Sequence, residues 1–209
     1  MIEESDLQLF IKALAFASHK HKDHRRKDQA ASPYIGHPIA LVNLLANEGG
    51  ITDPEILCAA LLHDTVEDTK TSSEELTEAF GASISGIVME VTDDRSLPKA
   101  ERKQTQVDHA PHLSVKAKAV KLADKTCNLR DVAKNPPHWW TLERRQQYFD
   151  WGKRVIDGLR GDWPELEALF DQQYQERPGE ETLKQRAKRY GRAMAENLNE
   201  NAKKGTLTP

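Results

Sequence analysis

One short stretch of the chain, residues 63–69, places a histidine and three carboxylates inside an otherwise apolar segment. His63 and Asp64 are neighbours on an expected helix, about 100° apart around its axis, so one ion between their directions can contact both. Glu67 and Asp68 follow one turn later on the same side. Ionised carboxylates without partners are costly to bury, so such a cluster must be solvated, paired or bound to a cation. The spacing favours the cation.

Two other segments supply further ligands for the same ion. His37 stands just before an expected helix start, and Asp124 lies on an expected helix with Asn128 one turn further on. Two neutral imidazoles and two carboxylates form a mixed nitrogen and oxygen set without a thiolate. This set suits Mn²⁺ best, and Fe²⁺ or Zn²⁺ less well. The expected metal ligands are His37, His63, Asp64 and Asp124.

A divalent cation in this set favours hydrolysis of a phosphate compound. Such an ion acidifies water and polarises a phosphoryl oxygen. Glu67 and Asp68 would then orient and deprotonate the attacking water as general base. A lone His-Asp pair is more often a structural hydrogen bond, and only its combination with a second histidine and a later helical aspartate reverses that interpretation.

The elements that must position these residues have the periodicity of helices. Apolar residues recur three and four positions apart over residues 7–18 and 115–129. Ser72 and Glu75 form a capping box, and the helix that follows is expected to stop at Gly81. Residues 63–68 are expected to continue the preceding helix. No segment alternates with a period of two, so the fold class is all-α, a compact bundle of about eight or nine helices.

Composition narrows the class of protein. The 209 residues are 38% hydrophobic and 30% charged, with a formal net charge of −3. No apolar run reaches the ~20 residues that span a membrane. The only two cysteines, Cys58 and Cys127, favour a reducing, cytoplasmic location over a disulfide framework. The mild acidity speaks against binding to nucleic acid, but it leaves room for a small phosphorylated substrate.

The end of the chain differs from the body in charge. Residues 178–209 hold seven basic and four acidic residues, so the remaining body, residues 1–177, carries a net charge of −6. Large apolar residues are too few in the tail to order it alone. We expect one domain over residues 1–177 and a charged C-terminal extension over 178–209, partly helical or disordered. A helix that binds a partner is the alternative for this extension.

Longer strings resemble the HD-domain metal-dependent phosphohydrolases of the RelA/SpoT type, most closely the small stand-alone SpoT-like hydrolases of metazoan type. The strings are Tyr-Ile-Gly-His-Pro at 34–38, His-Asp-Thr-Val-Glu-Asp-Thr at 63–69, Val-Thr-Asp-Asp at 91–94, Leu-Pro-Lys at 97–99, Glu-Arg-Lys at 101–103 and Leu-Ala-Asp-Lys-x-x-Asn-Leu-Arg at 122–130. The resemblance covers residues 5–175 and implies an HD-domain helical bundle.

The resemblance also implies an activity. The implied activity is removal of the 3′-diphosphate from guanosine 3′,5′-bis(diphosphate), or ppGpp. The products are GDP and pyrophosphate, and Mn²⁺ is the usual metal. In that family the positions matching the four expected ligands bind the metal. The pair matching Glu67 and Asp68 acts on the attacking water.

A substrate with two diphosphates requires positive groups close to the metal. Arg26 and Lys27 lie in the basic run at residues 20–28, shortly before His37. Such a run is also typical of a solvated helix end. The position of the run and the matching Arg-Lys pair of the family favour substrate contact for Arg26 and Lys27.

Other substrate-binding candidates have plain alternatives as surface charges or core aromatics. Tyr148 follows Arg144 by one turn, so Tyr148 could stack on a base while Arg144 takes a phosphate. The further candidates are Lys99, Arg102 and Asn128. The run His19, His21 and His24 lacks a completing carboxylate or cysteine and is expected to be exposed. Trp139 and Trp140 have no chemical context, so surface or packing roles are expected for them.

Two other functions stay open. Another HD phosphohydrolase would share the metal set and act on a different nucleotide, such as the 2′-phosphate of NADPH or a nucleoside triphosphate. A metal-free binding domain with this fold is disfavoured, because it would have no reason to keep so many costly polar groups together. We expect a guanosine nucleotide as small-molecule partner, no nucleic acid and no membrane. The sequence leaves a homo-oligomer open.

Overall fold

The structure, a computed structural model, describes residues 4–28 and 30–179, and helices dominate them. In chain order the elements are α1 (Glu4–Lys20), α2 (Gly36–Asn43), the π-helix η1 (Leu44–Glu48), α3 (Pro54–Leu62), α4 (Thr65–Asp68), α5 (Ser73–Val91), α6 (Lys99–His109), the 3-10 turn η2 (Ala110–His112), α7 (Val115–Lys134), α8 (Leu142–Asp157) and α9 (Pro164–Tyr174). These nine α-helices of the described residues confirm the expected all-α class and the expected helix number.

Local signals place several helix ends where the sequence predicts them. The Ser72 side chain accepts a hydrogen bond from the backbone N–H of Glu75 at the start of α5. Gly81 interrupts α5 with a φ of 84°, so this element is two helices joined at a kink. Only glycine adopts this backbone conformation without strain. The expected helix end at Gly81 is therefore confirmed.

The expectation of one helix running through residues 63–68 is wrong. α3 ends at Leu62, and α4 begins only at Thr65. Asp64 between them has φ −100° and ψ 1°, outside the helical region. The Thr65 hydroxyl donates to the Leu62 carbonyl at 2.6 Å and so stabilises the break. The Asp68 N–H still donates to the Asp64 carbonyl at 2.9 Å, so the one-turn spacing survives.

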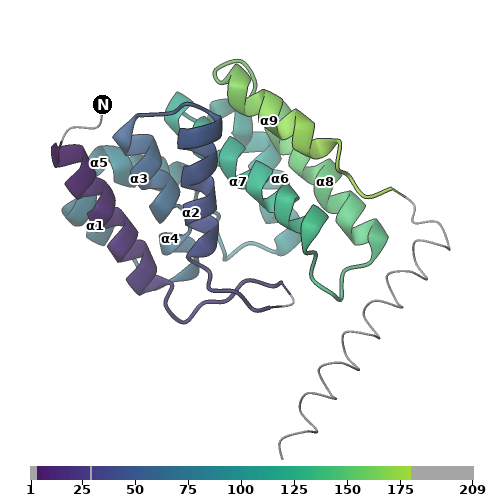
Figure 1. Cartoon of the computed structure of the whole chain (residues 1–209), viewed down its shortest axis with the longest axis horizontal. Coiled ribbons are helices and arrows are strands. Elements are labelled where there is room, and N and C mark those ends of the chain that lie inside the picture. The colour runs from purple at the N-terminus through teal and green to yellow at the C-terminus, as the bar shows by residue number, and fades with distance from the viewer. Residues whose placement is uncertain (1–3, 29, 180–209) are drawn as a thin grey trace, which may run out of the picture. The chain divides into compact units, whose positions relative to one another are not determined.

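Helix α7 lies at the centre of the packed helices. It contacts α2, α3, α5, α8 and α9. Figure 1 shows the N-terminal helices, in purple and blue, on one side of it and α8 and α9, in green, on the other. Twelve of its residues are buried, and they include Lys121, Asp124 and Lys125 as well as apolar core residues. The central helix therefore brings charged groups into the core, where they need partners.

The described residues up to Arg177 form one compact unit. The expected extension over residues 178–209 lies, from residue 180 onward, outside the described residues. Within the described part of the chain, no helix has the length and apolar character needed to cross a membrane.

Candidate active site

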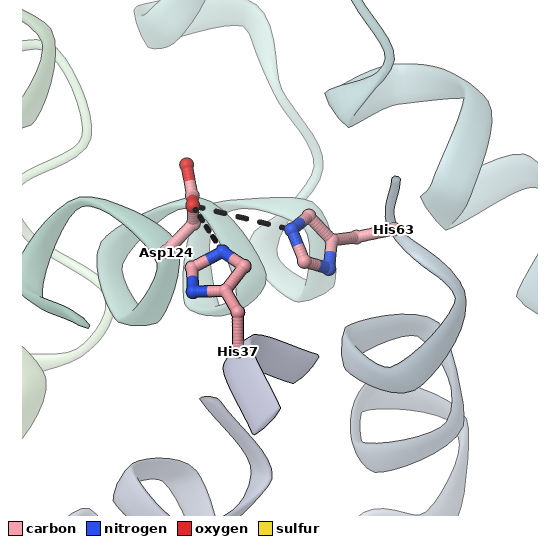
Figure 2. Close-up of side chains that lie close together, drawn as sticks. All are labelled: His37, His63 and Asp124. Carbon is pink, nitrogen blue, oxygen red and sulfur yellow. Dashed lines mark ion pairs between the residues drawn. The ribbon is translucent and has the colours of Figure 1, made fainter. Parts of the chain in front are cut away.

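Three helices bring two histidines and an aspartate to one point in the core. Figure 2 shows His37 from α2, His63 from the end of α3 and Asp124 from α7, with both imidazoles directed at the same carboxylate. Asp124 Oδ1 lies 3.3 Å from His37 Nε2 and 4.0 Å from His63 Nε2. One ligand atom from each residue lies within 4.8 Å of the others, which is the proximity that a shared metal ion requires.

The fourth expected ligand, Asp64, lies beside His63, next to this group of three residues. Its Oδ2 lies 2.8 Å from His63 Nε2 and accepts a hydrogen bond from the Tyr34 hydroxyl. Sequence reasoning quoted Tyr34 within a motif without giving it a role. The structure brings all four expected ligands together, and their role as ligands stays a prediction.

The hydrogen bonds of His63 identify the nitrogen that is available to a cation. Its Nδ1 lies 2.9 Å from the Ala60 carbonyl oxygen, which can only accept, so Nδ1 carries the hydrogen. In the neutral ring Nε2 then presents a lone pair towards Asp64 and Asp124. The neighbours of this buried Nε2 are the carboxylates of Asp64 at 2.8 Å and Asp124 at 4.0 Å, and an ionised carboxylate cannot donate a hydrogen to it. A lone pair that faces two carboxylates is unfavourable unless a cation or a proton lies between them, so the set fits a metal ion.

The protonation states of these groups are compatible with metal binding. Burial lowers the pKa of His37, which keeps this imidazole neutral. Burial opposes ionisation of Asp124, but the Lys125 ammonium and His37 outweigh it and hold the pKa of Asp124 well below its usual range. Burial also opposes the charged form of His63, yet the neighbouring Asp64 and Asp124 raise its pKa. A proton on His63 and a metal ion would therefore compete for the same nitrogen.

Two side chains of α7 hold Asp124 in place. Lys125 Nζ donates to Asp124 Oδ2 at 3.0 Å, and Asn128 Nδ2 donates to Oδ1. Asn128, expected to bind substrate, thus directly supports a candidate metal ligand. The sequence marked Lys125 only as part of a motif, because a buried lysine beside an aspartate has no periodic signal of its own.

Glu67 and Asp68, the expected pair for water activation, lie on α4. The backbone N–H of Asp93 donates to Glu67 Oε2 at 3.3 Å, and Arg95 Nε donates to Glu67 Oε1 at 3.3 Å. Arg95 also forms an ion pair with Asp68. Burial, followed by the negative charges of Asp93 and Asp64, raises the pKa of Glu67. A glutamate with a raised pKa is suited to accept and return a proton near neutral pH.

An inner cavity of about 280 Å³ surrounds this cluster, and its charge is predominantly negative. Five carboxylates face three lysines there: Asp64, Glu67, Asp68, Asp93 and Asp124 against Lys27, Lys121 and Lys125. The two histidines are left out of this count. His37 is neutral, so the carboxylates outnumber the cations even when His63 is protonated. The excess of negative charge suits a divalent cation.

A larger cavity of about 1390 Å³ adjoins the inner one, with which it shares His37, Asp68 and Tyr148. Eight basic residues line it, and six acidic ones: Arg25, Arg26, Lys27, Arg95, Lys99, Arg102, Lys103 and Arg144 against Asp23, Asp28, Asp68, Asp93, Asp131 and Glu143. This outer cavity is therefore suited to an anion, and it adjoins the cluster of expected metal ligands.

The structure places all seven expected substrate-binding residues on these cavities. Arg26, Lys27, Lys99, Arg102, Asn128, Arg144 and Tyr148 line the outer one. Arg26 is engaged in an ion pair with Asp131, and its guanidinium lies over the Tyr34 ring at 5.6 Å. Their role in substrate binding stays a prediction.

Two tryptophans that line the outer cavity form cation–π contacts with basic side chains. Arg144 lies 4.6 Å from the ring centre of Trp140, and Lys103 lies 4.4 Å from that of Trp151. Burial, followed by the charges of Lys99 and Lys125, lowers the pKa of Lys103 to about 8. Sequence reasoning gave Trp140 no chemical context and missed Trp151 and Lys103. The Glu-Arg-Lys string at 101–103 was the available signal for Lys103.

The expectation that the histidine run at 19–24 is exposed is wrong for His21. This side chain is 1% exposed, and its ring centre lies 4.8 Å from that of Tyr34. Its Nδ1 lies 3.1 Å from His24 Nδ1, and burial lowers the pKa of His21 to about 4. His21 is therefore a neutral packing residue behind Tyr34, a contact that sequence spacing does not reveal.

Comparisons with known proteins agree with this geometry. Residues 13–148 match the HD domain family. The guanosine-3′,5′-bis(diphosphate) 3′-pyrophosphohydrolase MESH1 of Xenopus tropicalis is 52% identical over 170 residues, covering 81% of this chain and 95% of that protein. The protein of the same name from Homo sapiens is 48% identical over 173 residues, covering 83% and 97%.

A solved structure is also similar to this chain. It belongs to a metazoan orthologue of SpoT that hydrolyses ppGpp and plays a role in starvation responses. The two structures match with a TM-score of 0.78 at 48% identity, over 81% of this chain and 95% of the other. The similarity therefore extends over nearly the whole of each of these three proteins.

Proposed function

The chain belongs to the HD domain family, among its stand-alone SpoT-like hydrolases, and from this premise we propose that it is a guanosine-3′,5′-bis(diphosphate) 3′-pyrophosphohydrolase. It hydrolyses ppGpp to GDP and pyrophosphate. One observation of the site supports this function most directly: an acidic inner cavity with a metal-type ligand set adjoins a larger basic cavity. The first suits a cation that acts on phosphate, and the second suits a nucleotide with several negative charges.

The HD domain and its ligand cluster indicate a divalent metal. We propose Mn²⁺, with Fe²⁺ and Zn²⁺ less well suited to a set of imidazoles and carboxylates without thiolates. The residues that would hold it are His37, His63, Asp64 and Asp124. When bound, such an ion acidifies water and polarises a phosphoryl oxygen.

Glu67 and Asp68 are proposed to act on the attacking water. The water oxygen bonds to the phosphorus that carries the ribose O3′, the bond from this phosphorus to O3′ breaks, and O3′ receives a proton. Both carboxylates line the inner cavity beside the ligand cluster. The raised pKa of Glu67 suits it to take a proton from the water.

The basic residues of the outer cavity are proposed to hold the diphosphates. Arg26, Lys27, Lys99 and Arg102 lie on it, and Arg144 and Tyr148 form part of its aromatic wall. A guanidinium binds phosphate oxygens bidentately, and an aromatic ring offers a surface for a base. Asn128 would contribute by keeping Asp124 in position.

We also propose that residues 1–177 form the catalytic domain and that the protein works in the cytoplasm. Cys58 and Cys127 are both free and buried, as expected of thiols in a reducing compartment. Burial raises the pKa of Cys58 to about 11 and that of Cys127 to about 12, so neither is a reactive thiolate.

A product assay tests the proposed function. The Mn²⁺-loaded protein is incubated with ppGpp, and the expected products are GDP and pyrophosphate. Asp68→Asn should abolish turnover while Mn²⁺ stays bound, whereas Asp108→Asn, an exposed change on α6, should leave both unchanged. Release of orthophosphate alone, or turnover of NADPH without turnover of ppGpp, would contradict the proposal.

A further inference from the structure

Arg95 occupies the loop between α5 and α6 and lies over the acidic pair of α4. Its Nε donates to Glu67 Oε1 at 3.3 Å, and its Nη2 forms an ion pair with Asp68 Oδ1. The side chain of Arg95 is nevertheless 55% exposed, against 17% for Glu67 and 20% for Asp68. One edge of the guanidinium thus faces the two carboxylates, and much of the side chain faces solvent.

Arg95 forms an ion pair with Asp68, one of the residues that the two cavities share. Asp68 lines both of them, Glu67 lines the inner one, and Arg95 lines the outer one. A phosphate group in the outer cavity that approaches Asp68 therefore also comes close to Arg95.

The position of Arg95 can reduce the repulsion between the substrate and the acidic pair. An anionic diphosphate must approach Glu67 and Asp68, two carboxylates that repel it. A guanidinium has five N–H donors in a planar fork, so it can contact a carboxylate with one edge and a phosphate oxygen with another. An ion pair this exposed contributes little to folding, which argues against a purely structural role for Arg95.

Arg102 does not replace Arg95 in this role. Its Nη1 lies 3.9 Å from Glu67 Oε1, and its side chain is only 25% exposed. It approaches Glu67 at a longer distance than Arg95 does, and it forms no ion pair with Asp68 within the described part of the chain. Among the arginines of the described residues, Arg95 alone forms ion pairs with both members of the acidic pair.

We propose that Arg95 binds the scissile 3′-diphosphate and screens it from Glu67 and Asp68. This inference rests on the proposed function and adds a substrate-binding residue to it. The 5′-diphosphate, which remains on GDP, would be held elsewhere in the outer cavity. Arg95 therefore contacts the diphosphate that leaves as pyrophosphate, and it does not contact the part of the nucleotide that becomes GDP.

Binding of the two products separately tests the proposal. Inorganic pyrophosphate and GDP are titrated by calorimetry into Mn²⁺-loaded wild-type protein, Arg95→Ala, Arg95→Lys and Arg154→Ala. The last is a matched control, because Arg154 is exposed on α8 and lines neither cavity. Loss of a charge-assisted contact should weaken pyrophosphate binding about ten- to hundredfold in Arg95→Ala and lower kcat/KM for ppGpp by a similar factor.

The companion measurements make the result specific. GDP should bind Arg95→Ala and wild type equally, Arg95→Lys should recover part of the pyrophosphate affinity, and thermal unfolding should be unchanged. Equal pyrophosphate affinity in Arg95→Ala and wild type would overturn the proposal. So would equal losses in Arg95→Ala and Arg154→Ala, which would indicate general charge attraction. Wild-type protein without ppGpp turnover would contradict the proposed function, whereas the pyrophosphate titrations test Arg95 independently.

Discussion

The Tyr34 hydroxyl offers a direct test of the candidate metal site. It donates a hydrogen bond to Asp64 Oδ2, the oxygen that also lies 2.8 Å from His63 Nε2. Burial, followed by the charge of Asp64, raises the pKa of Tyr34, so the hydroxyl remains a donor at every working pH. Tyr34→Phe removes this donor and keeps the ring that packs between His21 and His37.

The expected loss follows from the number of groups that hold Asp64. Its Oδ2 contacts both His63 Nε2 and the Tyr34 hydroxyl, so the variant loses the hydrogen-bond donor that orients the carboxylate towards the ligand cluster. Loss of such a supporting hydrogen bond lowers metal affinity about 10- to 100-fold, or about 1.4 to 2.7 kcal/mol. Turnover at limiting Mn²⁺ should fall by the same factor and should recover as Mn²⁺ is raised.

Competition with a chelator of known affinity measures the Mn²⁺ dissociation constant in both proteins. Tyr148→Phe is the matched control, because it also removes a hydroxyl from the cavity wall, and in the described part of the chain that hydroxyl forms no hydrogen bond with the four expected ligands. Equal Mn²⁺ affinity in Tyr34→Phe and wild type would refute the assignment of Asp64 as a ligand held by Tyr34. An equal loss in Tyr148→Phe would show that any change in the cavity has this effect.

Two further predictions concern pH and stability. Burial, Asp93 and Asp64 raise the pKa of Glu67, and since the base must be ionised, kcat/KM should rise with pH through a value above that of an ordinary glutamate. Asp93→Asn removes a neighbouring negative charge and should move this acid limb to lower pH, and an unmoved limb in a pH–rate series would contradict the role of Glu67. Gly81→Ala should lower the free energy of unfolding by about 1–3 kcal/mol, because φ is 84° there. Gly86→Ala, in open space inside the same element, should raise it by about 0.5–1 kcal/mol, and denaturant titrations that give both the same sign would refute the reasoning.

The residues with strong chemical signals could be predicted from the sequence. The residue types of His37, His63, Asp64 and Asp124 and their places on the expected helices favour a shared ion, and the structure brings these side chains close together. The helices themselves follow from apolar periodicity and from caps such as Ser72. Each of these signals is local, because a cap or a helical face depends on residues within one or two turns.

The rest depends on contacts between distant segments. The burial of His21 results from packing against Tyr34, and no pattern within residues 19–24 predicts it. The contact of Arg95 with Glu67 depends on how the loop between α5 and α6 returns over α4. The break at Asp64 is likewise invisible to a periodic pattern, because the apolar residues on either side of it fit one continuous helix.

The ligand cluster also has a consequence for folding. Its members come from α2, the end of α3 and α7, which are far apart in the chain and meet only in the folded protein. A cation that binds them has no comparable site in the unfolded chain, so it acts as a removable cross-link between three helices. At a free concentration a hundredfold above its Kd, a ligand of this kind stabilises the folded state by about 2.7 kcal/mol. Shortage of metal would therefore reduce the amount of folded protein as well as its rate of catalysis.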